Sequence, residues 1–429
     1  MLSAVSIVGA CALATATLAE DIPTRSTAVT VDSAKQAGGE HAGHARRIPN
    51  GVVSLDVVAD GGRLHLLLGK HQDGRASVWH QVSTDAGRNW SDAIEVQGPP
   101  GAGAVFMRGS DARIVARGMN LVAIWTSKVE GNKHGGAGPM VASRSTNGGK
   151  SWTPAPAPAD WPKGPHSFFT LGADAKTLHA AWLDSRDGKV PIEGAQAMRY
   201  AFSLDSGVTW SANSTLDGVT CACCWNAGGA DKAGNFYVLY RDKRPSDMAL
   251  GVVDAKTKQW TRLATVGAFG WDFPGCPHIG GGLAIKSNGG STEMHAVVGT
   301  RRKGDAGFYY VKSADGGRSW TTPFKLGDES AAHGDVALSK DGRLAAVWDM
   351  IDAETNDGSL AIYEAQSNDG GLHWTAARRL SAPKASASHP RLVASNNGFV
   401  AFWTEQSEGA DARLAITRIY NEKLGQAGR

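Results

Sequence analysis

Cysteine is the residue whose placement in this sequence points most directly to chemistry. Three of the five cysteines lie within four positions, in the run 221–224, and a fourth belongs to the Cys-Pro-His run 276–278. Closely spaced thiols can pair as a disulfide or hold a metal ion that prefers sulfur, and a neighbouring imidazole suits the same metals. The candidate metal ligands are Cys221, Cys223, Cys224, Cys276 and His278. Sulfur and imidazole ligands suit copper or zinc. Their spacing is not that of a zinc finger, so it does not choose between the two metals.

A disulfide is the alternative use of these thiols. Cys276 could bridge to Cys221, Cys223 or Cys224 in an oxidising compartment. A bond between the adjacent Cys223 and Cys224, or across the Cys-x-Cys pair, would be strained, so two unstrained bridges are hard to build from these four thiols. We therefore expect one or two free thiols beside His278 even where one bridge forms.

A repeated octapeptide indicates the elements that position these side chains. The pattern Ser-x-Asp/Asn-x-Gly-x-x-Trp occurs five times, at residues 83–90, 145–152, 203–210, 313–320 and 367–374. A decayed sixth copy ends at Trp260. Each copy predicts a hairpin turn, in which the Asp accepts hydrogen bonds from backbone amides, the Gly takes a positive φ and the Trp anchors the turn. Apolar alternating segments flank the copies, so the chain is predicted to be all-β.

These octapeptides are Asp-boxes, and over most of its length the chain resembles the sialidase-type (BNR-repeat) β-propellers. The resemblance implies a single propeller of four-stranded antiparallel blades, which we place at residues 46–421. Recurring units begin near residues 47, 110, 166, 221, 276, 333 and 389 and favour seven blades, with the six of sialidases as the alternative. The last unit has only three strands, and we expect the segment 27–32 to supply the fourth and close the ring.

Strand polarity predicts where the reactive side chains gather. In an up-and-down blade, the start of the innermost strand and the end of the second strand lie at the same rim. Cys, His, Arg and Asp collect at these positions, so that rim is the expected ligand-binding mouth. The residues expected to bind a ligand there are Arg47, His166, Arg241, Asp242, Arg244, Arg301, His333 and His389. The alternative for each of them is a structural role, in an ion pair or hydrogen bond that ties blades together.

The resemblance to sialidases is incomplete where the chemistry matters. Arg47-Ile48-Pro49 resembles the Arg-Ile-Pro start of that fold, where the Arg holds a substrate carboxylate, and two of the rim arginines could complete the clamp. The family's Tyr nucleophile has no counterpart, because His333 and His389 begin the late inner strands. Asp56 is an acid/base candidate that no other feature supports. We therefore assign no catalytic residue.

The cysteine runs carry a second resemblance. Exported bacterial Asp-box proteins that are mostly labelled sialidase-like share Cys-x-Cys-Cys, Tyr/Trp-Arg-Asp and Cys-Pro-His, found here at 221–224, 240–242 and 276–278. We interpret the chain as a propeller whose Cys/His/Arg-lined mouth binds a small ligand or a soft metal. The first alternative is a sialidase-type glycoside hydrolase that acts on an acidic sugar. The second alternative is a non-catalytic scaffold for a protein partner.

The N-terminus and the composition limit the remaining functions. Residues 1–19 are apolar and uncharged, which predicts a secretion signal and a periplasmic or secreted protein, and residues 20–45 are predicted to be a flexible leader. A lipoprotein modified at Cys11 and a short membrane anchor are the alternatives, the latter at the lower limit of spanning length. The net charge of +3, without a basic run, does not indicate nucleic acid binding.

Overall fold

The computed structural model describes residues 49–106, 109–130, 136–188, 192–288, 291–355, 357–396 and 398–420. The chain divides into two compact units, 1–41 and 42–429, and all described residues belong to the second. The predicted signal, leader, closing strand 27–32 and Arg47 therefore lie outside the described residues. Within the described part, no helix is long and apolar enough to cross a membrane.

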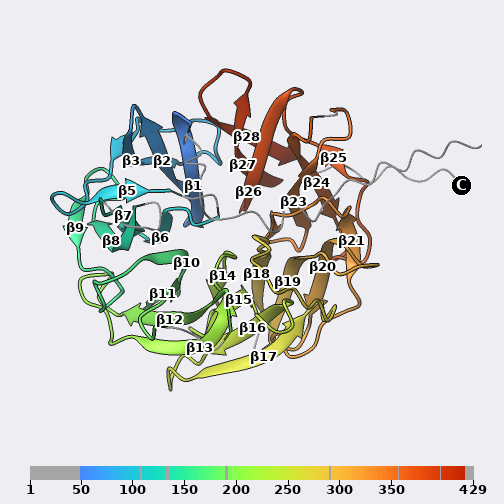
Figure 1. The fold of residues 1–429 in the computed structure, drawn as a ribbon, viewed down its shortest axis with the longest axis horizontal. Helices are drawn as coiled ribbons and strands as arrows, with labels where there is room; N and C mark the ends of the chain where they lie inside the picture. The colour runs from blue at the N-terminus through green and yellow to red at the C-terminus, as the bar shows by residue number, and fades with distance from the viewer. Residues whose placement is uncertain are drawn as a thin grey trace, which may run out of the picture. The chain divides into compact units, whose positions relative to one another are not determined.

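Seven antiparallel sheets, each built from consecutive strands, make up the described part of the chain (Figure 1). Five have four strands, the second has five and the seventh has three. Blades 1 to 3 contain β1 (Gly51–Asp60), β2 (Arg63–Gln72), β3 (Arg75–Ser83) and β4 (Ile94–Glu95); β5 (Gly103–Val105), β6 (Arg113–Arg117), β7 (Asn120–Lys128), β8 (Ala137–Ser145) and β9 (Thr153–Ala155); and β10 (His166–Ala173), β11 (Leu178–Asp184), β12 (Ala195–Ser203) and β13 (Ser214–Cys221).

The remaining four sheets continue the same order around the ring (Figure 1). Blades 4 to 7 contain β14 (Ala227–Ala230), β15 (Phe236–Arg241), β16 (Met248–Val253) and β17 (Trp260–Val266); β18 (Gly282–Asn288), β19 (Ser291–Thr300), β20 (Gly307–Ser313) and β21 (Phe324–Gly327); β22 (Gly334–Leu338), β23 (Leu344–Ile351), β24 (Leu360–Ser367) and β25 (Arg378–Arg379); and β26 (Ala385–Ser395), β27 (Gly398–Ser407) and β28 (Arg413–Tyr420).

The innermost strands close the ring. β1 packs on β6, β6 on β10, β10 on β14, and the sequence continues through β18, β22 and β26 back to β1. Backbone hydrogen bonds join the ends, because Val52 N donates to Ala412 O at 2.8 Å and Ala412 N donates to Asn50 O at 2.8 Å. The seven-bladed prediction is therefore confirmed over the six-bladed alternative.

The octapeptide turns form as their side chains predict. Ser83 Oγ accepts a hydrogen bond from Gly87 N at 2.8 Å, and Asp85 Oδ1 accepts from Arg88 N at 3.0 Å and Asn89 N at 2.9 Å. Gly87 takes a φ of 77°. Hydrogen bonds from the Asn89 backbone and side chain lower the pKa of Asp85 to about 2. These turns join the third strand of a blade to the fourth, at the rim opposite the predicted mouth.

Charged side chains tie the inner strands together near the axis. Asp56 of β1 accepts a hydrogen bond from Arg113 Nη1 at 3.0 Å and forms an ion pair with Arg391 at 3.2 Å. Arg113 also donates to the carbonyl of Phe169 in blade 3 at 3.1 Å. Asp56 is buried. Its partners show that this side chain links blades 1, 2 and 7. Asp56 therefore has a structural role in the ring.

Candidate metal centre

Three cysteines reach one point because the chain reverses between blades 3 and 4. Cys221 is the last residue of β13, where it pairs with Ala195 of β12. Cys223 and Cys224 lie in the following turn, before β14 begins at Ala227. The sequence predicts all three at the start of an inner strand. The structure corrects this, because Cys221 ends the outer strand of blade 3 and only the turn leads to the inner strand.

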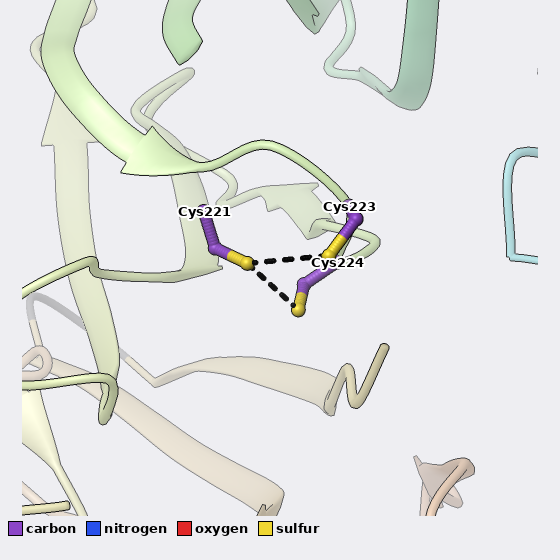
Figure 2. Close-up of side chains that lie close together, drawn as sticks. All are labelled: Cys221, Cys223 and Cys224. Atoms are coloured by element: carbon purple, nitrogen blue, oxygen red, sulfur yellow. Dashed lines mark hydrogen bonds between the residues drawn. The ribbon is translucent and has the colours of Figure 1, made fainter. Parts of the chain in front are cut away.

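The three thiols lie within contact distance of one another. Cys221 Sγ lies 3.2 Å from Cys224 Sγ and 3.6 Å from Cys223 Sγ (Figure 2). Their exposed fractions are 2%, 1% and 8% respectively. Both separations are well above the roughly 2.05 Å of a disulfide bond. They approach the roughly 3.8 Å between two thiolates that share one zinc or copper ion, given metal–sulfur bonds of about 2.3 Å.

Cys276 joins this cluster from the segment before blade 5. It is half-buried, packs against the core that contains the other three cysteines, and its thiol interacts with those of Cys221 and Cys223. The expectation that the two cysteine runs meet in space is therefore confirmed. All four cysteines are free thiols in this structure, so a disulfide from Cys276 stays a prediction.

The thiols set one another's ionisation. Hydrogen bonds from Cys223, Cys224 and Cys276 hold the pKa of Cys221 below its ordinary value. The contact with Cys221 raises the pKa of Cys223, and burial raises the pKa of Cys224. The interactions among the thiols therefore act in opposite directions on the pKa values of Cys221 and Cys223.

Two buried cationic side chains lie beside the thiols. Arg241 is 1% exposed and lowers the pKa of Cys224 through its charge, against the stronger effect of burial. Lys243 is 2% exposed, lies next to Cys276, and donates from Nζ to Gly275 O at 2.8 Å. Among the ion pairs of the described residues, neither cation has a carboxylate partner. Buried positive charge of this kind favours thiolate over thiol.

Trp225 extends from the cysteine turn across the axis of the ring. A Cβ on Gly109, between β5 and β6 of blade 2, would lie 2.9 Å from its ring, and a Cβ on Gly280, before blade 5, would lie 1.9 Å away. Its ring centroid lies 4.6 Å from that of His333 and 5.5 Å from that of His389, in blades 6 and 7. A side chain of blade 4 that contacts blades 2, 5, 6 and 7 lies between them all, at the centre.

A second group of metal-ligand types surrounds Asp349. His333, Asp349 and His389 bring ligand atoms within 4.8 Å of one another. Asp349 is fully buried, and its carboxylate contacts His333 Nδ1 at 2.6 Å and accepts from His389 N at 2.8 Å. His333 Nε2 lies 3.0 Å from the carbonyl of His278. Both ring nitrogens of His333 thus lie within hydrogen-bond distance of an oxygen atom. This group is already hydrogen-bonded internally.

The other predicted mouth residues occupy several environments. His166 is buried, accepts from Met140 N at 2.9 Å, and packs between Trp161 and Trp182. Asp242 accepts from Arg262 at 3.0 Å, and burial raises its pKa.

The arginines and His278 differ in their burial and in their hydrogen bonds. Arg241 donates to the carbonyls of Ile279 at 2.7 Å and Gly299 at 2.9 Å and also to that of Ser246. Arg301 is half-buried, and burial lowers its pKa. Arg244 and His278 are exposed. A ligand-binding role for these residues stays a prediction.

Sequence reasoning missed Lys243 and Trp225 as members of the site. Trp225 directly follows the cysteine run, and Lys243 follows the Tyr-Arg-Asp motif, so adjacency was the available signal. Adjacency does not say which side chains turn inward. Burial of both beside the cysteines depends on packing between blades.

Comparisons with known proteins concern the fold of the chain. The model of the BNR repeat-like domain family matches residues 116–402, more than half of the chain. The polysaccharide lyase Uly1 is 9% identical with a TM-score of 0.53, and the match covers 89% of this chain and 91% of the lyase. No curated protein matches.

Two further solved structures are similar at lower scores. A Trypanosoma rangeli sialidase is 15% identical with a TM-score of 0.47, and the match covers 73% of this chain and 54% of the sialidase. YCF48 bound to a D1 peptide is 14% identical with a TM-score of 0.46, and the match covers 87% of this chain and 94% of YCF48. The match to Uly1, at 9% identity, shows the fold alone, so the activity has to be argued from the site.

Proposed function

Because this chain belongs to the BNR repeat-like domain family, whose propeller fold hosts unrelated activities, we propose its function from the cysteine cluster: it binds one soft metal ion, copper(I) or zinc. The observation that carries the proposal is the convergence of Cys221, Cys223 and Cys224 Sγ atoms, with the two shortest separations at 3.2 and 3.6 Å. Thiolates are the preferred ligands of both ions.

Charge balance supports a metal–thiolate centre over neutral thiols. Three thiolates with copper(I), or four with zinc, carry a net charge of about −2 by formal counting. Arg241 and Lys243 supply two positive charges in the same buried region. A disulfide or a set of neutral thiols would leave both cations without a counter-charge, which is costly in a protein interior.

The group of His333, Asp349 and His389 is less suited to a metal ion than the cysteine cluster. The ring nitrogens of His333 and the carboxylate of Asp349 already bind acceptors and donors within the protein. A metal ion there would have to displace these hydrogen bonds. The Cys221 thiol contacts the thiols of Cys223 and Cys224, so metal binding would replace weak S–H contacts with strong bonds.

The predicted signal at residues 1–19 supports export to the periplasm or beyond, and we propose that the metal is bound there. A sialidase-type reaction has less support. Its arginine clamp would need Arg47, outside the described residues, together with two rim arginines. Of these, Arg241 already donates to three backbone carbonyls.

The test is metal content together with a thiol count. Protein purified anaerobically and loaded with copper(I) or zinc is expected to hold about one ion per chain, by elemental analysis. Cys224→Ser should abolish this stoichiometry, whereas Ala222→Ser, which adds a hydroxyl beside the cysteines, should preserve it. A wild-type protein with four titratable thiols that fails to retain either ion would refute the proposal.

A further inference from the structure

Burial separates Cys276 from the other three cysteines. Cys221, Cys223 and Cys224 are buried, whereas Cys276 is half-buried. Cys276 packs against the core that contains the other three cysteines, and part of its surface is exposed. It is therefore the one cysteine of the described residues that an incoming carrier could reach while the buried set stays in place.

The surroundings of Cys276 suit a ligand that binds and releases. It belongs to the connection between β17 and β18, outside any strand. A Cβ on Gly194 would lie 3.7 Å from Cys276 Sγ and 3.1 Å from Lys243 Nζ, so these groups lie together beside a residue without a side chain. The Lys243 ammonium donates to the carbonyls of Pro274 and Gly275, which directly precede Cys276. These contacts place a positive charge where an anionic metal–thiolate complex would approach.

We infer that Cys276 is a transfer ligand, through which the site exchanges copper(I) with a thiol-bearing carrier, while Cys221, Cys223 and Cys224 hold the ion at rest. This inference rests on the proposed function and names its partner: a small or protein thiol that delivers or accepts copper(I). Copper(I) is stable with three thiolates, whereas a structural zinc site takes four ligands. A resting set of three buried thiols therefore favours copper(I).

The transfer balances without an oxidant or reductant. The ion arrives on two carrier thiolates, and Cys276 sulfur bonds to it as one carrier sulfur leaves and takes the Cys276 proton. Bonds to Cys221, Cys223 and Cys224 then form, and the second carrier thiolate leaves. Cys276 regains a proton from the buried thiols as its bond to copper breaks. The three buried thiols lose three protons in all: one goes to Cys276, one to the second carrier sulfur and one to solvent, and copper stays monovalent.

The experiment measures loading rate and affinity separately. Metal-free protein is mixed with the copper(I)–glutathione complex, and loading is followed by stopped-flow absorbance of the copper–thiolate band. Equilibrium affinity is measured by competition with bathocuproine disulfonate. We expect Cys276→Ser to hold copper(I) with nearly unchanged affinity and to load at least about tenfold more slowly, because the accessible thiol is lost. Ala222→Ser should match the wild type in both measurements.

The possible outcomes distinguish the transfer role of Cys276 from the proposed metal binding itself. Unchanged loading in Cys276→Ser would overturn the transfer role. Loss of bound metal from Cys276→Ser, as complete as from Cys224→Ser, would also overturn it, because Cys276 would then be a resting ligand of a four-thiolate site. Both results would leave the proposed function intact, whereas absence of metal from the wild type would remove the proposed function itself. Thermal unfolding of each variant shows whether it is folded.

Discussion

The indole of Trp225 and the imidazole of His333 lie 4.6 Å apart, centroid to centroid, although they belong to blades 4 and 6 of the ring. Trp225 directly follows Cys224, and His333 is bound to Asp349. One aromatic side chain therefore joins the cysteine cluster to the histidine group on the other side of the axis. The two groups are distinct in their chemistry and adjacent in space.

Gly280→Ala is expected to destabilise the fold because of Trp225. A Cβ at Gly280 would lie 1.9 Å from Cε2 of the indole, so the ring or the backbone must move, at a cost of about 1–3 kcal/mol. Gly218→Ala is the matched control, because a Cβ there meets nothing within 4 Å. Urea unfolding measures both.

The double variant tests whether Trp225 is the cause. Trp225→Phe removes part of the ring, so its combination with Gly280→Ala should cost less than the sum of the two single changes. Additive losses would mean that the indole does not occupy the position next to Gly280.

Asp349→Asn should separate the histidine group from the metal function. The Asp349 carboxylate accepts from His333 N at 3.0 Å and His389 N at 2.8 Å and contacts His333 Nδ1 at 2.6 Å, fully buried. Removing the charge leaves His333 without its ionic partner, and we expect a loss of about 3–5 kcal/mol in the free energy of unfolding. Copper or zinc stoichiometry should stay at the wild-type value. Loss of the metal from folded Asp349→Asn would assign the metal to the histidine group instead.

The fold could be predicted because its signals are local. The Ser83 and Asp85 contacts that make an Asp-box turn each join residues four positions apart, so a repeated octapeptide is enough to place the blades. Strand polarity then predicted that Cys276 meets Cys221. The burial of Lys243 could not be predicted in this way. It depends on the segment 274–276 folding back over blade 4, which no local pattern specifies.

The role of Arg241 could not be predicted from the sequence either. Arg241 was expected at the mouth as a ligand-binding residue from its position at the end of β15. Its guanidinium instead donates to carbonyls of residues 246, 279 and 299, which come together only in the folded ring. Residue type and strand position predicted the location of Arg241 near the cysteines. Its hydrogen-bond partners could be identified only from the tertiary structure.

Stability is expected to fall steeply as the pH drops from about 6.5 to about 4. Burial lowers the pKa values of His65, His80, His179 and His295 to about 4. Between these pH values the unfolded chain binds protons that the folded chain excludes, so each such histidine removes at most about 1.4 kcal/mol per pH unit. Below about pH 4 the folded chain binds them too and this contribution levels off.

The buried pair His65 and His80 offers a direct check. Their ring nitrogens lie 3.1 Å apart, so protonating both would place two charges in contact. His80→Gln should reduce the slope of the unfolding free energy against pH by about one proton, measured by urea unfolding at several pH values. Gln81→Asn, which changes the neighbouring side chain without removing a titratable group, should leave the slope unchanged. Equal slopes in all three proteins would contradict the assignment.

Lys243→Met should weaken the metal complex while sparing the metal-free fold. The Lys243 ammonium is 2% exposed, lacks a carboxylate among the ion pairs of the described residues, and lies beside Cys276. Removing it takes away a counter-charge of the metal–thiolate centre, and we expect affinity for copper(I) to fall about 10–100-fold, the usual effect of losing a group that supports metal ligands. The metal-free variant should unfold at the same or higher urea concentration, because an uncompensated buried charge is gone. Lys232→Met, at an exposed lysine on the opposite rim, controls for net charge and should keep the wild-type affinity. If Lys243→Met bound copper(I) as tightly as Lys232→Met, the positive charge would play no part in holding the ion, and the charge-balance argument for a metal–thiolate centre would lose its basis.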